Sequence, residues 1–172
     1  MSRTRKLTRA GILTALALVF LYAGAWVPRG GIALAALACL VGAAVLIECG
    51  LWWAVGHYVA VAVLALLLSP DKTPALWYAL ALGPWPVLKS LIERLSPAAL
   101  RWALKLAVFC ACMAALYFLF SAAFTGAVPQ APVYVLLPAL AAVFVVFDIA
   151  FTRLIGLYLR RVHRANRKEE SL

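Results

Sequence analysis

The sequence predicts an all-α integral membrane protein, a six-transmembrane-helix bundle with both the N and C termini in the cytoplasm. Three observations predict it: 67% of the 172 residues are hydrophobic, the mean hydropathy is +1.01, and only 13% of the residues are charged. Soluble domains carry about 25% charged residues, so the composition excludes that class. A helix that crosses the bilayer needs about 20 mostly apolar residues, and the chain contains six such runs.

Turn-forming residues separate the six runs: Pro28 and Gly30 after the first, Gly50 after the second, and Ser69-Pro70-Asp71-Lys72 after the third. The fourth run contains Gly83-Pro84-Trp85-Pro86, so it is either one kinked helix or a re-entrant segment. The expected helices are 10–27, 30–47, 51–68, 73–92, 101–124 and 133–158. They form a single membrane domain, 1–172, whose last residues, 159–172, are a basic cytoplasmic tail.

The positions of the basic residues predict the orientation, because cytoplasmic loops are enriched in Lys and Arg. With six crossings and the N terminus inside, the basic clusters at 3–9, 89–105 and 153–168 are all cytoplasmic. A re-entrant fourth segment would place the 89–105 cluster outside, so the bias favours six complete crossings. The N-terminal run also looks like a secretory signal, but it continues to Val27, beyond the usual signal core, and we expect it to be retained.

Ionisable residues occur near the predicted cytoplasmic ends of the helices, where burial is costly unless the charges are paired. They are Glu48, Lys89, Glu93, Lys105, Asp148 and Arg153. Three alternatives are open: mutual pairing that orders the inner half of the bundle, a docking surface for a partner, or a proton-linked role for Asp148. The basic segment 89–105 is expected to meet lipid phosphates or an acidic partner, and the tail is expected to contact anionic lipids. No nucleic-acid partner is expected, since the basic residues follow the membrane topology.

Aromatic residues gather near the predicted outer face. The candidates are Tyr22, Trp26, Trp77, Tyr78, Tyr117 and Tyr134. Belts of Trp and Tyr are normal at membrane interfaces, whereas helices broken by proline line binding cavities in transport proteins. The aromatic residues are therefore either interfacial anchors or the lining of a pocket for a small, largely apolar or aromatic ligand. Polar contacts to that ligand, or a lid over it, would come from the outer loops, from Gln130, Lys72, Asp71 or Arg29.

The chain lacks the motifs of common catalytic and phosphate-binding sites: HExxH, GxSxG and GxxxxGK[ST] are all missing from the sequence. His57 has no second His or Cys at i+3 or i+4, so we expect it to be hydrogen-bonded within the bundle instead of binding a metal. The four cysteines are expected to be small apolar packing residues. We expect no enzymatic activity, cofactor or metal.

In layout the chain resembles the substrate-binding S-component of energy-coupling factor (ECF) vitamin transporters. Six helices, a basic N terminus leading into the alanine-rich segment Leu7 to Ala17, and Pro28 closing the first helix carry the likeness. The resemblance implies a subunit of the bacterial cytoplasmic (inner) membrane that binds a vitamin-like small molecule near the outer side. It also implies a membrane coupling subunit and an ATPase pair as partners.

In the family that this layout resembles, the S-component docks through small residues of its first helix. Carried over, these are Gly11 and Ala15, while Trp77, Tyr78, Tyr117 and Tyr134 become pocket candidates. The link Pro28-Arg29-Gly30 is too short to form the lid that the family places after the first helix. A second function stays open: a non-transporting six-helix scaffold that recruits an envelope or division partner through its cytoplasmic charges.

Overall fold

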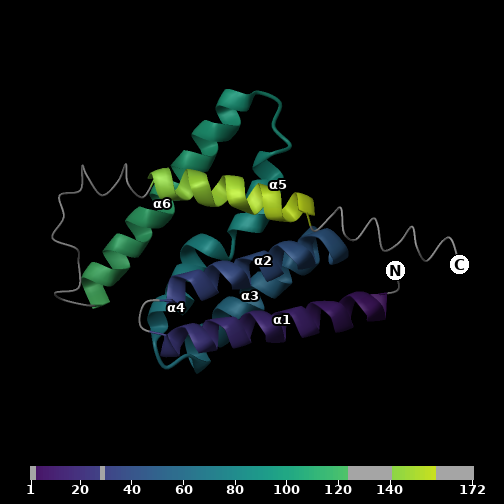
Figure 1. Cartoon of the computed structure of the whole chain (residues 1–172), viewed down its shortest axis with the longest axis vertical. Coiled ribbons are helices and arrows are strands. Elements are labelled where there is room, and N and C mark those ends of the chain that lie inside the picture. The colour runs from purple at the N-terminus through teal and green to yellow at the C-terminus, as the bar shows by residue number, and fades with distance from the viewer. Residues whose placement is uncertain (1–2, 28–29, 124–140, 158–172) are drawn as a thin grey trace, which may run out of the picture. The chain divides into compact units, whose positions relative to one another are not determined.

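The computed structural model describes residues 3–27, 30–123 and 141–157, and the regular structure in these residues is helical (Figure 1). The helices are α1 (Arg3–Trp26), α2 (Gly31–Cys49), α3 (Leu51–Leu68), α4 (Lys72–Trp77), the π-helix η1 (Tyr78–Leu82), α5 (Trp85–Ile92) and α6 (Ala98–Ala123). Residues 141–157 are also helical.

Five stretches of the described chain are long and apolar enough to cross a membrane: Arg3–Trp26, Gly31–Cys49, Leu51–Leu68, Lys72–Ile92 and Ala98–Leu119. The protein is therefore an all-helical, multi-pass membrane protein, as its composition predicts. The sixth expected span, 133–158, lies partly outside the described residues. The chain divides into two compact units, Met1–Val128 with α1 to α6, and Pro129–Leu172 with helix 141–157.

The ends of α3 follow the hydropathy of the sequence, whereas the start of α1 does not. Helix α3 spans the expected residues, because Gly50 turns the chain with a φ of 99° before it and Ser69 is extended after it. Helix α1 begins at Arg3, seven residues before the apolar run. Its basic first turns are tied to the end of α2, since Lys6 Nζ donates to the Cys49 carbonyl at 3.4 Å.

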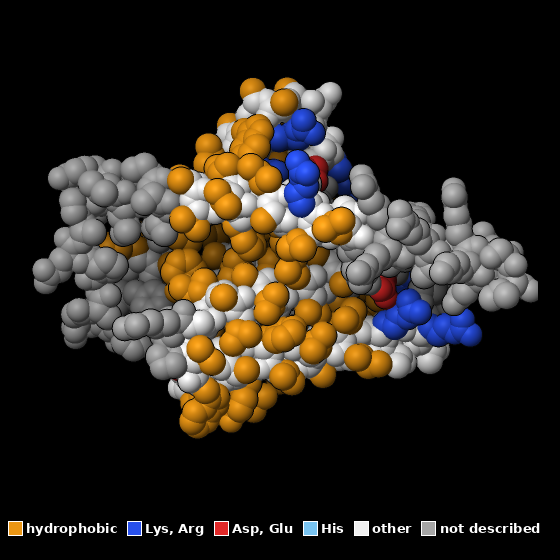
Figure 2. Space-filling view, viewed as in Figure 1, with side chains coloured by type: hydrophobic (Ala, Val, Ile, Leu, Met, Phe, Trp, Pro, Cys, Tyr) orange, Lys and Arg blue, Asp and Glu red, His pale blue; other side chains and the backbone are white. Residues whose placement is uncertain are grey.

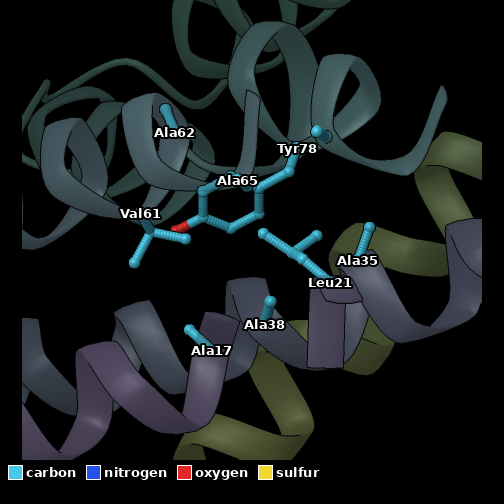
Figure 3. Packing of buried hydrophobic residues seen from close by; sticks show 9 residues of the cluster. Ala17, Leu21, Ala35, Ala38, Val61, Ala62, Ala65 and Tyr78 are labelled. Atoms are coloured by element: carbon cyan, nitrogen blue, oxygen red, sulfur yellow. The ribbon is translucent and has the colours of Figure 1, made fainter. Parts of the chain in front are cut away.

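The core of the first unit is built from α1, α2, α3 and the start of the fourth span. Figure 3 shows the ring of Tyr78 among small side chains, with Leu21 and Val61 beside it. Small residues let the helices approach closely without a hydrophobic force between them. At Gly31 a Cβ would lie 2.9 Å from the carbonyl oxygen of Gly24, so α1 and α2 meet backbone to backbone there.

The fourth span is a single helix interrupted by η1. Gly83 N donates to the Tyr78 carbonyl at 2.6 Å, the i→i+5 bond of a π-helix. The next residue, Pro84, has no N–H to give to the carbonyl of Ala79. The hydroxyl of Tyr58 from α3 donates to that carbonyl at 2.8 Å instead.

The described part of the chain exposes many large apolar side chains. Figure 2 shows hydrophobic side chains spread widely over the described surface in view, with charged side chains confined to small clusters. Trp52 is 84% exposed and Leu67 72% exposed, which in water would favour aggregation and in lipid is favourable. The core of small residues and the large apolar exterior are both typical of a helix bundle in a bilayer.

Candidate functional site

An apolar groove of about 330 Å³ lies between the C-terminal halves of α1 and α3. Its lining residues are Leu18, Val19, Tyr22 and Ala23 from α1, and Ala65, Leu68 and Ser69 from α3 and its end. The short side chains of Ala23 and Ala65 leave space between the two helices that larger residues would fill. The volume falls within the range of small-molecule binding sites.

A polar turn borders one end of this groove. Ser69, which lines the groove, donates from Oγ to the Asp71 carbonyl at 2.7 Å. Lys72 Nζ donates to the Ser69 carbonyl at 2.6 Å, and the Asp71 carboxylate accepts a hydrogen bond from Thr73 N at 2.9 Å. These bonds hold one ammonium and one carboxylate next to an otherwise apolar surface.

Of the described aromatic candidates, Tyr22 lines the groove. Trp26 lies one turn further along α1, where its ring centroid is 6.5 Å from that of Tyr22 and 68% of the residue is exposed. Tyr134 lies outside the described residues. The structure therefore places Tyr22 at the groove and Trp26 beside Tyr22, outside the groove lining.

The other described aromatic candidates lie elsewhere. Trp77 is half-buried at the end of α4, and Tyr78 is 1% exposed, with its ring centroid 6.4 Å from that of Tyr58 in the core. Tyr117, on α6, is 49% exposed and packs edge-on against Phe118. Among the residues that the structure describes, the aromatic candidates do not converge on one pocket. Their role in ligand binding stays a prediction.

Gly11 and Ala15, the predicted docking residues, both lie on the exposed side of α1. A Cβ added at Gly11 would meet no atom within 4 Å. The helix therefore offers a shallow, small-residue face on which another helix can pack closely. Its use in docking stays a prediction.

Four of the six candidate docking charges form two ion-pair clusters in the first unit. Glu48 Oε2 lies 3.2 Å from Nη1 of Arg9, which links α2 to α1. Lys89 Nζ and Lys105 Nζ each lie 3.3 Å from Oε1 of Glu93, which links α5 to α6. Pairing among the six charges is therefore found for Lys89, Glu93 and Lys105, whereas the partner of Glu48 is Arg9, outside that set.

Asp148 and Arg153 belong to helix 141–157 of the second unit, where Thr152 Oγ1 donates to the Asp148 carbonyl at 2.7 Å. The docking role of these two residues and the proton-linked role of Asp148 stay predictions.

His57 is 4% exposed, and its hydrogen bond within the bundle confirms the prediction. Its Nδ1 lies 2.9 Å from Oγ1 of Thr14, which itself donates to the Ala10 carbonyl at 2.8 Å. A hydroxyl has one proton, so with this bond to Ala10 the histidine Nδ1 carries the hydrogen and donates to Thr14. Nε2 is then an acceptor with no hydrogen-bond partner in the described part of the chain. A Cβ at Gly42 would lie 3.6 Å from it.

No protein-family model, curated protein or solved structure matches this chain. The functional assignment therefore rests on the groove, the ion pairs and the exposed face of α1. Sequence reasoning missed the groove residues Leu18, Ala23 and Ala65, because apolar residues of this kind recur throughout the chain. Only the pairing of α1 with α3 distinguishes them.

Proposed function

We propose that this protein is the membrane substrate-binding subunit of an ATP-driven uptake transporter for a vitamin-like micronutrient. The groove of about 330 Å³ between α1 and α3 is the observation that carries the proposal. A largely apolar groove with a few polar groups at one end suits a small, largely apolar ligand. Ser69 is the polar residue that lines the groove, and Lys72 and Asp71 of the bordering turn are the charged groups that we expect to contact a polar end of such a ligand.

The proposed orientation places this groove on the side from which a nutrient arrives. With the N terminus in the cytoplasm, α1 and α3 both run outward, so their C-terminal halves lie in the outer half of the bilayer. The basic residues of the chain support this orientation, together with a sixth span at 133–158 and a cytoplasmic C terminus.

Helix α1 would join ligand capture to docking. Tyr22 lines the groove, and Gly11 lies eleven residues earlier, about 16 Å along the helix at 1.5 Å per residue. Small residues such as Gly11 and Ala15 permit close contact with a helix of a membrane coupling subunit, which an ATPase pair would drive.

The test is purification of the full chain from its own host in mild detergent, followed by native mass spectrometry of the bound proteins and small molecules. The proposal expects a coupling subunit with two ATPases, or a stoichiometric small molecule. Recovery with envelope or division proteins and no small molecule would contradict it and favour the scaffold.

A matched pair of variants tests the docking face. Gly11 and Gly56 are both exposed helical glycines around which an added Cβ meets no atom within 4 Å. Gly11→Leu should therefore remove the coupling subunit from the purified complex, whereas Gly56→Leu should leave it in place. Equal recovery with the two variants would contradict docking through α1.

A further inference from the structure

A second cavity, of about 370 Å³, lies at the junction of α5 and α6. It is lined by Glu93, just after the end of α5, and by Arg101, Trp102 and Lys105 from the first turns of α6. Since Lys72–Ile92 and Ala98–Leu119 are both candidate spans, this junction is where the chain turns at a membrane boundary. The cavity is therefore at the depth of lipid headgroups.

The charges in this cavity are not equivalent. The carboxylate of Glu93 already accepts from Lys89 and Lys105, whose side chains are 4% and 8% exposed. Lys105 Nζ also lies 5.4 Å from the ring centroid of Trp102, a cation–π contact. The side chain of Arg101 forms no ion pair or hydrogen bond with the described part of the chain. Its guanidinium is thus the cation of this cavity that can take an external anion.

We propose that this cavity binds the phosphate of one anionic phospholipid, with Arg101 as the principal contact. The planar guanidinium matches phosphate oxygens in a two-pronged hydrogen bond. Trp102, 42% exposed, has the amphipathic ring that favours the headgroup region. Basic pockets between helices at the cytoplasmic boundary are known to bind anionic headgroups.

Apolar residues next to the cavity favour a lipid over a free phosphate ion. Leu104 and Leu106 follow Trp102 on α6 and are each 38% exposed. Acyl chains attached to a phosphate held at Arg101 would cover such residues, whereas an inorganic anion would leave them uncovered. The site does not depend on transport, so this inference goes beyond the proposed function.

The test is a native mass spectrometry titration of the full chain with phosphatidylglycerol and, separately, phosphatidylcholine with the same acyl chains. One phosphatidylglycerol should bind about tenfold more tightly than phosphatidylcholine, a difference of about 1.4 kcal/mol. Both lipids carry the phosphate, but the choline ammonium of phosphatidylcholine would lie close to the Arg101 guanidinium and be repelled by it. Arg101→Gln should remove this preference. Arg94→Gln is the matched control, since Arg94 carries the same charge at the same junction but does not line the cavity. It should change the affinity by about twofold or less.

Two results would overturn the inference. Equal losses in the Arg101→Gln and Arg94→Gln variants would show diffuse attraction by a basic surface instead of a site. Displacement of the lipid by inorganic phosphate at the same concentration would show a site for a free anion. If Arg101→Gln fails to fold, Arg101→Lys is the variant to measure, because it keeps the charge and removes the planar guanidinium. Several-fold weaker binding of phosphatidylglycerol would support the two-pronged contact, and unchanged binding would contradict it.

Discussion

The hydroxyl of Tyr58 lies 2.8 Å from the carbonyl oxygen of Ala79 and donates a hydrogen bond to it. This bond joins α3 to the π-helix η1 at the carbonyl that Pro84 leaves without a backbone donor. Inside a bilayer no water replaces a missing partner, so an interrupted helix needs a neighbouring side chain to satisfy it. Tyr58 is that side chain, and its hydroxyl stabilises the packing of α3 against the fourth span.

Replacing Tyr58 by Phe should lower the free energy of unfolding by about 1 kcal/mol, because the carbonyl of Ala79 loses its donor while the ring stays. The measurement is reversible unfolding of the purified protein in mixed micelles of mild detergent and sodium dodecyl sulfate. Tyr22→Phe is the control, since the structure gives the half-exposed Tyr22 no hydrogen bond in the described part of the chain. Equal stability of the two variants would show that the Tyr58 hydroxyl has no stabilising role.

Gly83→Ala should destabilise the protein by about 2 kcal/mol through overpacking. A Cβ there would lie 2.7 Å from Cδ2 of Tyr58 and 2.8 Å from the Tyr78 carbonyl oxygen, and the carbonyl belongs to backbone that cannot move easily. Gly56→Ala, in open space on α3, should instead leave stability unchanged or raise it by up to about 1 kcal/mol. Thermal unfolding midpoints in one detergent compare the two, and an unchanged midpoint for Gly83→Ala would contradict the packing around η1.

Thr14→Val should cost about 1 to 2 kcal/mol, because His57 would then have no hydrogen-bond partner in the described part of the chain at either ring nitrogen. Val has nearly the same shape as Thr, so the change removes the hydroxyl with little loss of packing. The control is Thr8→Val: the exposed Thr8 hydroxyl bonds only to the Thr4 carbonyl of its own helix. The same unfolding assay applies, and a loss as small as that of Thr8→Val would show that the Thr14–His57 bond adds little.

Hydropathy and turn residues predict much of this fold. The ends of α3 follow from Gly50 and Ser69, because both residues lie directly beside an uninterrupted apolar run. The early start of α1 does not follow from hydropathy, since it depends on contacts between Lys6 and Cys49 across two helices. The π-helix is also beyond sequence reasoning: Gly83 and Pro84 predict an interruption, but only the position of Tyr58 shows how it is stabilised.

The candidate site is less predictable than the fold. The sequence identifies Tyr22 as a candidate, yet it does not distinguish Ala23 and Ala65 from the many other alanines of the chain. A groove depends on which small residues face one another across two helices. The sequence of one helix does not determine which residues of the other helix it faces. The ion pair between Lys89 and Glu93 is easier to predict from the sequence, because the two residues are four apart and fall on one helix face.

The most direct measurement asks whether the groove between α1 and α3 holds the ligand. Native mass spectrometry would count small molecules bound to the wild-type protein, to Ala23→Phe, which fills the groove, and to Ala33→Phe, which adds the same ring at an exposed alanine of α2 outside it. We expect one small molecule bound to the wild type and to Ala33→Phe, and none to Ala23→Phe. A ligand retained by Ala23→Phe, or no ligand on the wild-type protein, would contradict the account.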